Sequence, residues 1–391
     1  MISVAEALEQ LFALLGPVRE ETVPLEAAVG RVLLRPVPAL RDQPPFDSSA
    51  MDGWAVRRAD AAPGARLRIV GESAAGKGFA GRLAEGQTVR ILTGAPLPEG
   101  ADAVVIQEEV IRDGDHVRLS PDAVAGHVRL RGGDFTAGMT FSAPRRLRPV
   151  EIALLAAFGH PALSVARRPE VAILSTGDEL VMPGEMPGPD QIFAANAFGL
   201  HALLTEAGAA PRILPVVPDD REALTYALSL AEGADLVVTI GGASVGDHDL
   251  VAPVAQAAGA ELSFHKVAMR PGKPLLAGRF PDGRLLLSLP GNPVSAMVCA
   301  IVFLRPMILA MLGLPPQPAP RQTAVLGAAL PAGGPREHYL RARLGPDGRV
   351  IPFPRQDSSL LSVLAEADCL LLQPAGSPPL SEGARVEILP I

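Results

Sequence analysis

The spacing of apolar residues predicts a helix at the start of the chain and then a change to short strands. Ser3 and Glu6 form a capping-box pattern, after which apolar residues recur at helical spacing as far as Gly16 and Pro17. A second short helix is predicted between residues 24 and 30. Beyond residue 41 short β-like runs separated by Gly and Pro turns follow, at residues 67–70, 88–92, 103–107, 117–119 and 127–130. These runs predict a small all-β unit.

Helical spacing returns after the β unit. A helix is predicted at residues 149–158 and a strand at 162–166. From residue 169 strand-like runs alternate with helical segments, with strands predicted at 171–175, 212–217, 235–240 and 262–267 and helices at 194–207, 221–231 and 250–258. Two further apolar runs, 274–278 and 285–289, precede a long helix that begins at residue 293. This alternation predicts a doubly wound, mostly parallel α/β domain.

A proline-rich linker at residues 314–321 leads to a second group of short strands, at residues 324–328, 339–344, 350–353 and 369–372. The expected fold class is therefore α/β plus β. Four domains are predicted: a discontinuous helical or mixed domain (1–41 and 131–168), an inserted β domain (42–130), the α/β domain (169–316) and a C-terminal β-barrel-like domain (317–391).

Composition narrows the class of protein. Of the 391 residues 48% are hydrophobic and 20% charged, which is typical of a globular chain with a large core. The net charge of -7 argues against a nucleic-acid-binding surface, which needs a basic face. No export signal is seen at the start, so a cytoplasmic location is expected. The apolar run at 294–312 contains Arg305 and Pro306, which favours a buried helix over a membrane span. Cys299 and Cys369 are expected to be core residues.

The chemistry is expected at the carboxyl ends of the α/β strands, where ligands of open α/β sheets bind. Five loops should share one crevice there, at residues 175–180, 218–220, 241–249, 266–274 and 289–296. One set of their residues suits phosphate or another oxyanion: Ser175, Thr176, Gly241, Gly242, Ser244, Gly246, Lys266, Arg270 and Lys273. A second set consists of carboxylates that repel an anion: Asp178, Glu179, Asp219, Asp247 and Asp249.

A bound cation would reconcile the two sets. Carboxylate oxygens are hard ligands that favour Mg²⁺, so the loops predict a magnesium-bridged phosphoanhydride or oxyanion site, with Glu179, Asp219 and Asp249 as candidate metal ligands. Structural alternatives remain open: Asp219 as N-cap of the helix that follows it, and Asp178 as the cap of a turn.

Scarce residues point to the same part of the chain. Lysine occurs only at Lys77, Lys266 and Lys273, and asparagine only at Asn196 and Asn292, so four of these five residues lie between 196 and 292. His248 and His265 are interpreted as bystanders. The chain contains no GxSxG, Walker or CxxC motif, which disfavours serine-hydrolase, P-loop NTPase and thiol redox chemistry.

Seven motifs together resemble a known family. In chain order they are FDSSAMDGWAV, ILTGAPLPEGADAVV, LRGGDFTAG, ILSTGDEL, GGASVGDHD, RPGKP and LPGNPVSA. The set closely resembles the molybdopterin molybdenumtransferase family, to which the E domain of gephyrin is related. The resemblance implies an elongated four-domain subunit and a homodimer with the active site between subunits, the discontinuous domain serving dimerisation. It also implies Mg²⁺-dependent insertion of molybdate into adenylylated molybdopterin with release of AMP, and a molybdopterin adenylyltransferase as a possible partner.

The resemblance also assigns roles to residues in the matching motifs. The catalytic positions it implies are Asp52, Thr93, Asp134, Glu179, Asp219, Asp249, Lys266 and Arg270. The substrate-binding positions are Ser175, Thr176, Gly177, Gly241, Gly242, Ser244, Gly246, Lys273, Pro290, Gly291, Asn292, Pro293, Arg341 and Ser358, the last two facing the pocket from the other subunit. Three features depart from the family pattern: Arg270 where some members have lysine, Trp54 in place of tyrosine, and the run 356–359.

Two other functions are compatible with parts of the sequence. A binding or scaffold protein could keep the fold without the chemistry, although no appended interaction segment is seen. A nucleotide pyrophosphatase built on the α/β module would account for the five loops, but it leaves the MDGWAV and LTGAP motifs unexplained.

Overall fold

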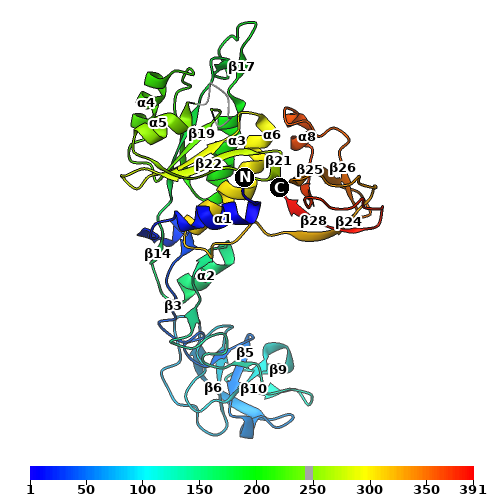
Figure 1. The fold of residues 1–391 in the computed structure, drawn as a ribbon. Helices are drawn as coiled ribbons and strands as arrows, with labels where there is room; N and C mark the ends of the chain where they lie inside the picture. Colours follow the sequence, from blue (N-terminus) through cyan, green and yellow to red (C-terminus); the bar gives the residue numbers. More distant parts are fainter. Residues whose placement is uncertain (243–249) are drawn as a thin grey trace. The chain divides into compact units, whose positions relative to one another are not determined.

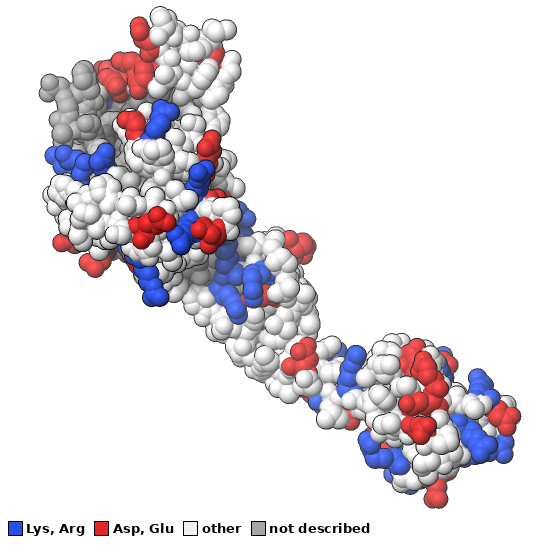
Figure 2. Space-filling model, turned by 90° about the vertical axis from the view of Figure 1, so that its right-hand side faces the viewer, with Lys and Arg blue, Asp and Glu red and all other residues white. Residues whose placement is uncertain are grey.

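The computed structural model describes residues 1–242 and 250–391, which fall into two compact units. Unit 1 comprises Met1–Glu21, Gly30–Val32 and Val165–Ile391, and unit 2 comprises Thr22–Val29 and Leu33–Ser164. On the face drawn in Figure 2, basic and acidic side chains form small separate groups between larger areas of other residues. The predicted division into four domains is finer than these two units and stays a prediction.

Unit 2 contains the predicted inserted β unit as a six-stranded sheet in the order β8-β5-β7-β6-β10-β9. The strands are β5 (Gly53–Val56), β6 (Arg66–Ser73), β7 (Gln87–Ile91), β8 (Ala103–Ile106), β9 (Val110–Asp113) and β10 (His116–Leu119). Consecutive residues of a strand point to opposite faces. Trp54 accordingly packs in one apolar cluster with Leu67 and Val117, and Ala55 in a second cluster with Val89 and Ile91. The sheet is therefore covered by apolar side chains on both faces.

Residues 20–166 also form several shorter strands and helices. A four-stranded sheet has the order β1-β14-β2-β13, from β1 (Glu20–Pro24), β2 (Val32–Leu33), β13 (Arg145–Arg146) and β14 (Ala162–Ala166). Two-stranded pairs join β3 (Val37–Pro38) to β12 (Thr140–Phe141) and β4 (Ser48–Ser49) to β11 (Val128–Arg129). The predicted helix at 149–158 is α2 (Pro149–Ala157), but the one predicted at 24–30 is only a 3₁₀ turn, Leu25–Ala27.

The N-terminal helix α1 (Val4–Ala13) forms where its capping box predicts it. The Ser3 side chain accepts a hydrogen bond from the Glu6 N–H, at 3.1 Å, and the Glu6 carboxylate accepts one from the Ser3 N–H, at 2.7 Å. One face of the helix is apolar and buried, through Val4, Leu8 and Leu11. Capping and this amphipathic face explain why the helix begins at Val4.

The α/β sheet in unit 1 has the order β18-β15-β19-β23-β22-β20. The strands are β15 (Glu170–Ser175), β18 (Ala210–Ile213), β19 (Leu236–Ile240), β20 (Glu261–Lys266), β22 (Pro274–Arg279) and β23 (Leu285–Leu289). Strands β18, β15, β19 and β23 pair in parallel, and β22 and β20 add antiparallel. The strand predicted at 212–217 begins and ends earlier, because residues from Leu214 onward already form the connection to the next helix.

Helices cover both faces of this sheet. Side chains of α4 (Arg221–Leu230) and α5 (Val251–Ala257) share an apolar cluster with Ala172, Val237 and Leu286 of the strands. Helices α3 (Ala195–Ala207) and α6 (Pro293–Cys299) lie on the other face (Figure 1). The doubly wound arrangement is confirmed, and the strands are buried on both faces, as their continuous apolar runs indicate.

The long helix predicted from residue 293 is interrupted by a π-helical turn. After α6 the turn spans Ala300–Leu304, and α7 (Arg305–Met311) continues it. Pro306 has no N–H to donate to the preceding turn, which accounts for the wider turn there. Residues Pro293–Met311 are long and apolar enough to span a bilayer, but 72% of this stretch is buried inside the protein. Burial of this kind is typical of a core helix, and Cys299 within it is fully buried.

The C-terminal sheet has the order β21-β25-β27-β28-β24, with β26 paired to β25. Its strands are β21 (Met269–Arg270), β24 (Gln322–Val325), β25 (Glu337–Leu344), β26 (Val350–Pro352), β27 (Cys369–Gln373) and β28 (Arg385–Pro390), and α8 (Leu361–Ala365) precedes β27. Strand β21 comes from the 266–274 loop and pairs parallel to β25, with Arg270 opposite His338. The predicted α/β plus β fold class is thus confirmed, and β21 is a connection that strand propensity did not predict.

Candidate functional site

A cavity of about 620 Å³ lies at the carboxyl ends of the parallel strands β15, β19 and β23. All five predicted loops contribute to its lining. Among the predicted site residues, those that line it are Ser175, Thr176, Glu179, Asp219, Gly241, Gly242, Pro290, Gly291, Asn292 and Pro293, with Pro274 from the 266–274 loop. The strands end together because they are parallel and in register, so segments distant in sequence meet at one edge.

The two described candidate metal ligands, Glu179 and Asp219, both line this cavity. One structural alternative made Asp219 the N-cap of α4. That alternative is wrong. Asp220 holds that position, since its side chain accepts a hydrogen bond from the Ala223 N–H at 2.9 Å. The Asp178 side chain accepts one from the Asp219 N–H at 3.2 Å and thereby shapes the turn. Among residues 1–242 and 250–391 no group of three or more His, Cys, Asp or Glu side chains could hold a metal ion.

Part of the predicted site lies outside the described residues. These residues are Ser244, Gly246, Asp247, His248 and Asp249. The third candidate metal ligand, Asp249, is one of them, so the proposed ligand set is not tested as a whole.

Gly241 and Gly242 permit a close approach of two chain segments. Both have positive φ, +92° and +60°, a conformation that other residues rarely adopt. A Cβ on Gly241 would lie 2.8 Å from the carbonyl oxygen of Thr176. The Gly241 N–H already donates to Leu289 O at 3.1 Å. Gly241 therefore brings the backbone close to the cavity, and its N–H is engaged within the protein.

Gly177 is another position at which a side chain would be unfavourable. Its φ is +151°, and a Cβ there would lie 2.4 Å from a carboxylate oxygen of Glu179. The Gly177 N–H donates to Val217 O at 3.1 Å. Gly177 is not part of the cavity lining, and its lack of a side chain leaves room for the Glu179 carboxylate beside it.

Two polar side chains in the lining have a buried atom with no hydrogen bond among the described residues. They are the Oγ1 of Thr176 and the Oδ1 of Asn196. The Nδ2 of Asn196 donates to Gly291 O at 2.7 Å, which holds the amide against the 289–296 loop. A buried polar atom without a partner is costly unless water or a ligand satisfies it. Asn196 was not a predicted site residue, although the scarcity of asparagine had drawn attention to it.

One wall of the cavity is apolar, and it was not predicted from the sequence. Leu180, Ile192 and Phe193 come from a two-stranded ribbon of β16 (Leu180–Val181) and β17 (Ile192–Phe193), on a loop that projects beyond the sheet (Figure 1). Ile192 is 58% exposed and Phe193 47%. Such short strands between proline and glycine residues carry too little periodicity to predict. Exposed apolar groups in a cavity wall suit the face of a flat ring.

The last domain contributes Ser359 and not the predicted Ser358 to the lining. The carbonyl of Ser358 instead accepts a hydrogen bond from the Val294 N–H, at 3.0 Å, at the start of α6. Ser358 and Ser359 are neighbours in residues 356–359, which depart from the family pattern, so the sequence alone could not distinguish them.

The predicted basic residues Lys266, Arg270 and Lys273 do not line the cavity, although Lys273 adjoins Pro274, which does. Arg341 is fully buried. Its Nη2 donates to Asp357 O at 3.0 Å, while its Nε and Nη1 have no hydrogen bond among the described residues. Burial lowers the pKa of Arg341, and the nearby charge of Arg270 acts in the same direction. The two arginines and His338 therefore form a basic cluster between β21 and β25.

His338 makes this cluster sensitive to pH. Burial and the charges of Arg270, Arg341 and Arg336 lower the pKa of His338 from 6.5 to about 4. Between these two pH values the unfolded chain binds a proton that the folded chain does not, so stability should fall as pH falls through this window. We expect His338→Gln to reduce the fall of the melting temperature between pH 6.5 and pH 4, measured by circular dichroism. An unchanged slope in the variant would refute this assignment.

Three predicted catalytic residues belong to unit 2. Asp52 and Thr93 contact each other: one carboxylate oxygen of Asp52 accepts hydrogen bonds from the N–H and the Oγ1 of Thr93, both at 2.7 Å. These bonds hold the pKa of Asp52 below its usual value, with a smaller contribution from Arg90. Asp134 is exposed, and its N–H donates to Gln43 O at 2.9 Å. Within unit 2 the MDGWAV and LTGAP motifs thus meet at one hydrogen-bonded pair.

Three family models match the chain in order. Residues 2–159 match the MoeA N-terminal region (domain I and II), residues 172–310 match a probable molybdopterin binding domain, and residues 323–391 match the MoeA C-terminal region (domain IV). The middle match contains all the cavity-lining residues between Ser175 and Pro293.

Curated proteins and solved structures agree with these matches. A molybdopterin molybdenumtransferase of Nostoc sp. is 38% identical over 94% of this chain and 88% of its own length. Molybdopterin molybdenumtransferase 2 of Mycobacterium tuberculosis is 36% identical over 99% of both chains. The crystal structure of a molybdopterin biosynthesis MoeA protein from Pyrococcus horikoshii OT3 is 28% identical, covers 100% of both chains and has a TM-score of 0.83. Sequence and fold are thus shared over the whole length, and the chain belongs to the molybdopterin molybdenumtransferase family.

Proposed function

We propose that this protein inserts molybdenum into molybdopterin, using adenylylated molybdopterin and molybdate as substrates and releasing AMP in a Mg²⁺-dependent reaction. The observation that carries the proposal is the single cavity in which carboxylates, glycine turns and an apolar wall converge. The names of the relatives support the molybdenum-transfer chemistry. The parts of the proposal that concern an adenylylated substrate and a bound metal are based on the chemical groups in the cavity lining.

The lining fits a magnesium ion. Glu179 and Asp219 contribute carboxylates, and Thr176 contributes a buried hydroxyl oxygen without a hydrogen bond among the described residues. Oxygen atoms of these kinds are the ligands that Mg²⁺ prefers in proteins. We assign Glu179 and Asp219, with Asp249 from the sequence, as the residues that would hold it. When bound, Mg²⁺ supplies charge neutralisation and polarises a phosphoryl oxygen.

The protein's own residues bind and orient the substrate. The Gly241–Gly242 turn lets the backbone reach the phosphates. The Oδ1 of Asn196, which has no hydrogen bond among the described residues, offers an acceptor to a hydroxyl or amino group. Phe193 and Ile192 provide an apolar surface for the pterin or the adenine ring. Attack of water on the adenylyl phosphorus breaks its bond to the molybdopterin phosphate, which leaves, and the adenylyl group becomes AMP. Attack of a molybdate oxygen on the same phosphorus also expels the molybdopterin phosphate, and water then hydrolyses the resulting adenylyl molybdate to AMP and molybdate. The dithiolene sulfurs of the substrate then take up molybdenum, with no part for Cys299 or Cys369, which are both buried.

The assembly and its surroundings also belong to this proposal. We propose a homodimer with the active sites between subunits, to which Asp52, Thr93 and Asp134 contribute together with the C-terminal segments around Arg341 and Ser358. The expected location is cytoplasmic, and a molybdopterin adenylyltransferase would supply the adenylylated substrate.

The proposal is tested by incubating the full chain with adenylylated molybdopterin, molybdate and Mg²⁺ and measuring AMP and molybdenum cofactor in the same sample. We expect equal amounts of the two products, and neither without Mg²⁺. Release of AMP from simple dinucleotides without molybdate would instead identify a nucleotide pyrophosphatase. Tight binding of adenylylated molybdopterin without turnover would identify a binding or scaffold protein.

A further inference from the structure

A second cavity, of about 310 Å³, lies at the opposite edge of the α/β sheet from the candidate site. Pro169, Asp235 and Arg284 in its lining each come directly before a parallel strand, β15, β19 or β23. The segment after α1 closes the cavity with Gly16, Pro17 and Arg19. The lining therefore sits at the amino ends of the strands, and it shares no residue with the candidate site.

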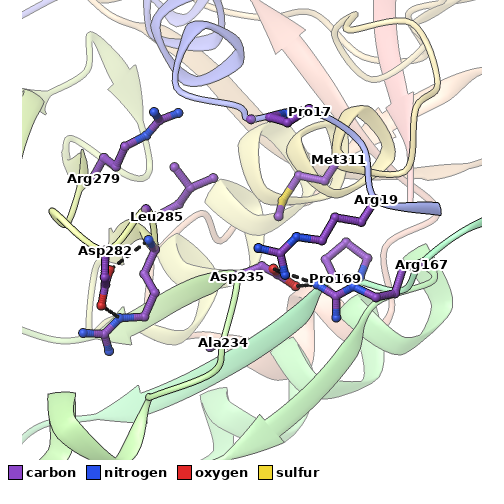
Figure 3. A pocket seen from close by; sticks show the side chains of 13 residues that line it. Pro17, Arg19, Arg167, Pro169, Ala234, Asp235, Arg279, Asp282, Leu285 and Met311 are labelled. Carbon is purple, nitrogen blue, oxygen red and sulfur yellow. Dashed lines mark hydrogen bonds and ion pairs between the residues drawn. The ribbon is translucent and has the colours of Figure 1, made fainter. Parts of the chain in front are cut away.

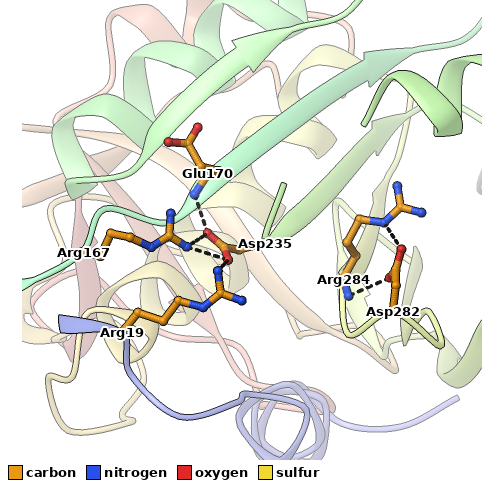
Figure 4. A network of polar contacts seen from close by, with 6 residues as sticks. All are labelled: Arg19, Arg167, Glu170, Asp235, Asp282 and Arg284. Carbon is orange, nitrogen blue, oxygen red and sulfur yellow. Dashed lines mark hydrogen bonds and ion pairs between the residues drawn. The ribbon is translucent and has the colours of Figure 1, made fainter. Parts of the chain in front are cut away.

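One side of this cavity is an ion-pair network around Asp235. Its two carboxylate oxygens accept hydrogen bonds from Arg167, at 2.6 and 2.8 Å, and one of them also accepts the Glu170 N–H at 2.8 Å. Arg19 forms an ion pair with the same carboxylate at 3.1 Å (Figure 4). The side chain of Asp235 is 14% exposed, whereas that of Arg19 is 69% exposed. Asp235 thus holds two guanidinium groups at the cavity and leaves much of Arg19 accessible.

The other side carries two more arginines. Arg284 pairs with Asp282 at 2.6 Å, donates to Leu228 O at 2.9 Å and lies over the ring of Phe280. Arg279 donates through Nη2 to Leu14 O, near the end of α1. The Nε of Arg279 is buried and has no hydrogen bond among the described residues. Figure 3 shows Arg279 across the cavity from Arg19 and Arg167, with Leu285 and Met311 between them.

The charges of the lining do not balance. Four guanidinium groups, of Arg19, Arg167, Arg279 and Arg284, face only two carboxylates, of Asp235 and Asp282. A structural ion-pair network alone would need no excess cation, and it would not leave a buried guanidinium N–H without a partner. We propose that this cavity is a binding site for a phosphate-class dianion, either free or as the phosphate of a mononucleotide.

The chemistry of the arginines favours phosphate. A planar guanidinium presents paired N–H donors that match the oxygens of a phosphate, and a dianion neutralises an excess of two positive charges. The cavity volume is at the lower end of the range for small-molecule pockets, which is more than one phosphate needs. Ala234, Leu285 and Met311 supply an apolar floor on which the remainder of a mononucleotide can rest.

The test is isothermal titration calorimetry of the full chain at low ionic strength with three ligands: inorganic phosphate, AMP and adenosine. We expect phosphate and AMP to bind and adenosine not to bind. AMP binding much more tightly than phosphate, with the difference lost in Arg279→Gln and Arg19→Gln, identifies the nucleotide as the source; equal affinity that falls in both variants identifies the free ion. We expect Arg279→Gln to weaken phosphate binding at least tenfold and Arg19→Gln to weaken it severalfold, because each removes a charged donor.

Controls separate this cavity from the candidate site. Arg68→Gln, on an exposed residue of β6 in unit 2, should leave phosphate binding unchanged. Lys273→Gln, at a predicted substrate-binding residue of the candidate site, should change only the part of the anion binding that remains in Arg279→Gln and Arg19→Gln. Arg279→Lys keeps the positive charge but loses the paired N–H donors of the guanidinium group, so this variant should bind phosphate with intermediate affinity. If Arg279→Gln does not fold by circular dichroism, Arg19→Gln decides the test, since its side chain is largely exposed.

Three results would overturn the proposal. The first is that the wild-type chain does not bind phosphate at millimolar concentration. The second is unchanged affinity in folded Arg279→Gln and Arg19→Gln. The third is loss of phosphate binding in Lys273→Gln alone, which would place the anion at the candidate site. None of these results bears on molybdenum insertion, so the two proposals can fail separately.

Discussion

Asp219→Asn should lower Mg²⁺-dependent AMP release about a hundredfold at a fixed Mg²⁺ concentration, and the loss should be partly recovered at higher Mg²⁺. Asparagine keeps the size of the side chain and one oxygen, but removes the negative charge that we assign to the metal. Loss of a charged ligand costs about 3 kcal/mol of stabilisation, or roughly two powers of ten in rate. The measurement is AMP release as a function of Mg²⁺ concentration, with molybdenum cofactor scored in parallel.

The adjacent Asp220 is the matched control for this variant. It caps α4 through its hydrogen bond from the Ala223 N–H, so Asp220→Ala should cost about 1 kcal/mol of stability. Its dependence on Mg²⁺ should equal that of the wild-type chain. The assignment of Asp219 fails if Asp219→Asn keeps wild-type turnover and half-saturation by Mg²⁺. It fails equally if both variants shift the Mg²⁺ dependence by the same amount.

Gly241→Ala should both destabilise the protein and reduce its activity. Alanine at a φ of +92° costs about 1–2 kcal/mol. The added Cβ would also lie 2.8 Å from Thr176 O, which is a backbone atom and cannot rotate away. We expect a total cost of about 3 kcal/mol, and more than a tenfold loss of activity, because the chain must shift in the cavity wall. Urea denaturation followed by circular dichroism, together with the AMP assay, measures both effects.

Gly233→Ala separates strain from steric overlap. Gly233 has a similar φ, +81°, but no atom of the described residues lies within 4 Å of the position of its Cβ. The cost should therefore be only the conformational one, about 1–2 kcal/mol, with activity retained. Equal destabilisation of the two variants would show that contact with Thr176 contributes nothing. Full activity in Gly241→Ala would show that this turn does not shape the site.

Much of the fold could be predicted from local sequence, because local sequence controls capping and hydrophobic periodicity. The capping box of Ser3 and Glu6 places the start of α1, and the buried apolar runs of β15, β19 and β23 identify the parallel core of the sheet. The loops after these strands could be assigned to one crevice because parallel strands end at one edge. The same loops carry the motifs through which the family was recognised.

Local sequence did not predict which of two adjacent, chemically similar residues takes a given structural role. Asp219 and Asp220 are equivalent in the sequence, and only the backbone dihedral angles make Asp220 the cap and turn Asp219 to the cavity. Ser358 and Ser359 are likewise adjacent, and only the structure shows that Ser359 lines the cavity whereas the Ser358 carbonyl bonds to the start of α6. Strand β21 has only two residues, so its pairing with β25 depends on the C-terminal sheet that receives it and not on its own propensity.

The sequence by itself determined the family, the order of the elements and the loops in which the acids and glycines of the candidate site lie. Only the tertiary structure decided which side chains share a cavity. It brought Asn196 and Phe193 into the wall of the first cavity, and it brought Arg19, Arg167 and Arg279 to the second. The physical reason is that such contacts join residues up to hundreds of positions apart. Their meeting depends on how packed layers end and face each other, which no local pattern of apolar and polar residues records.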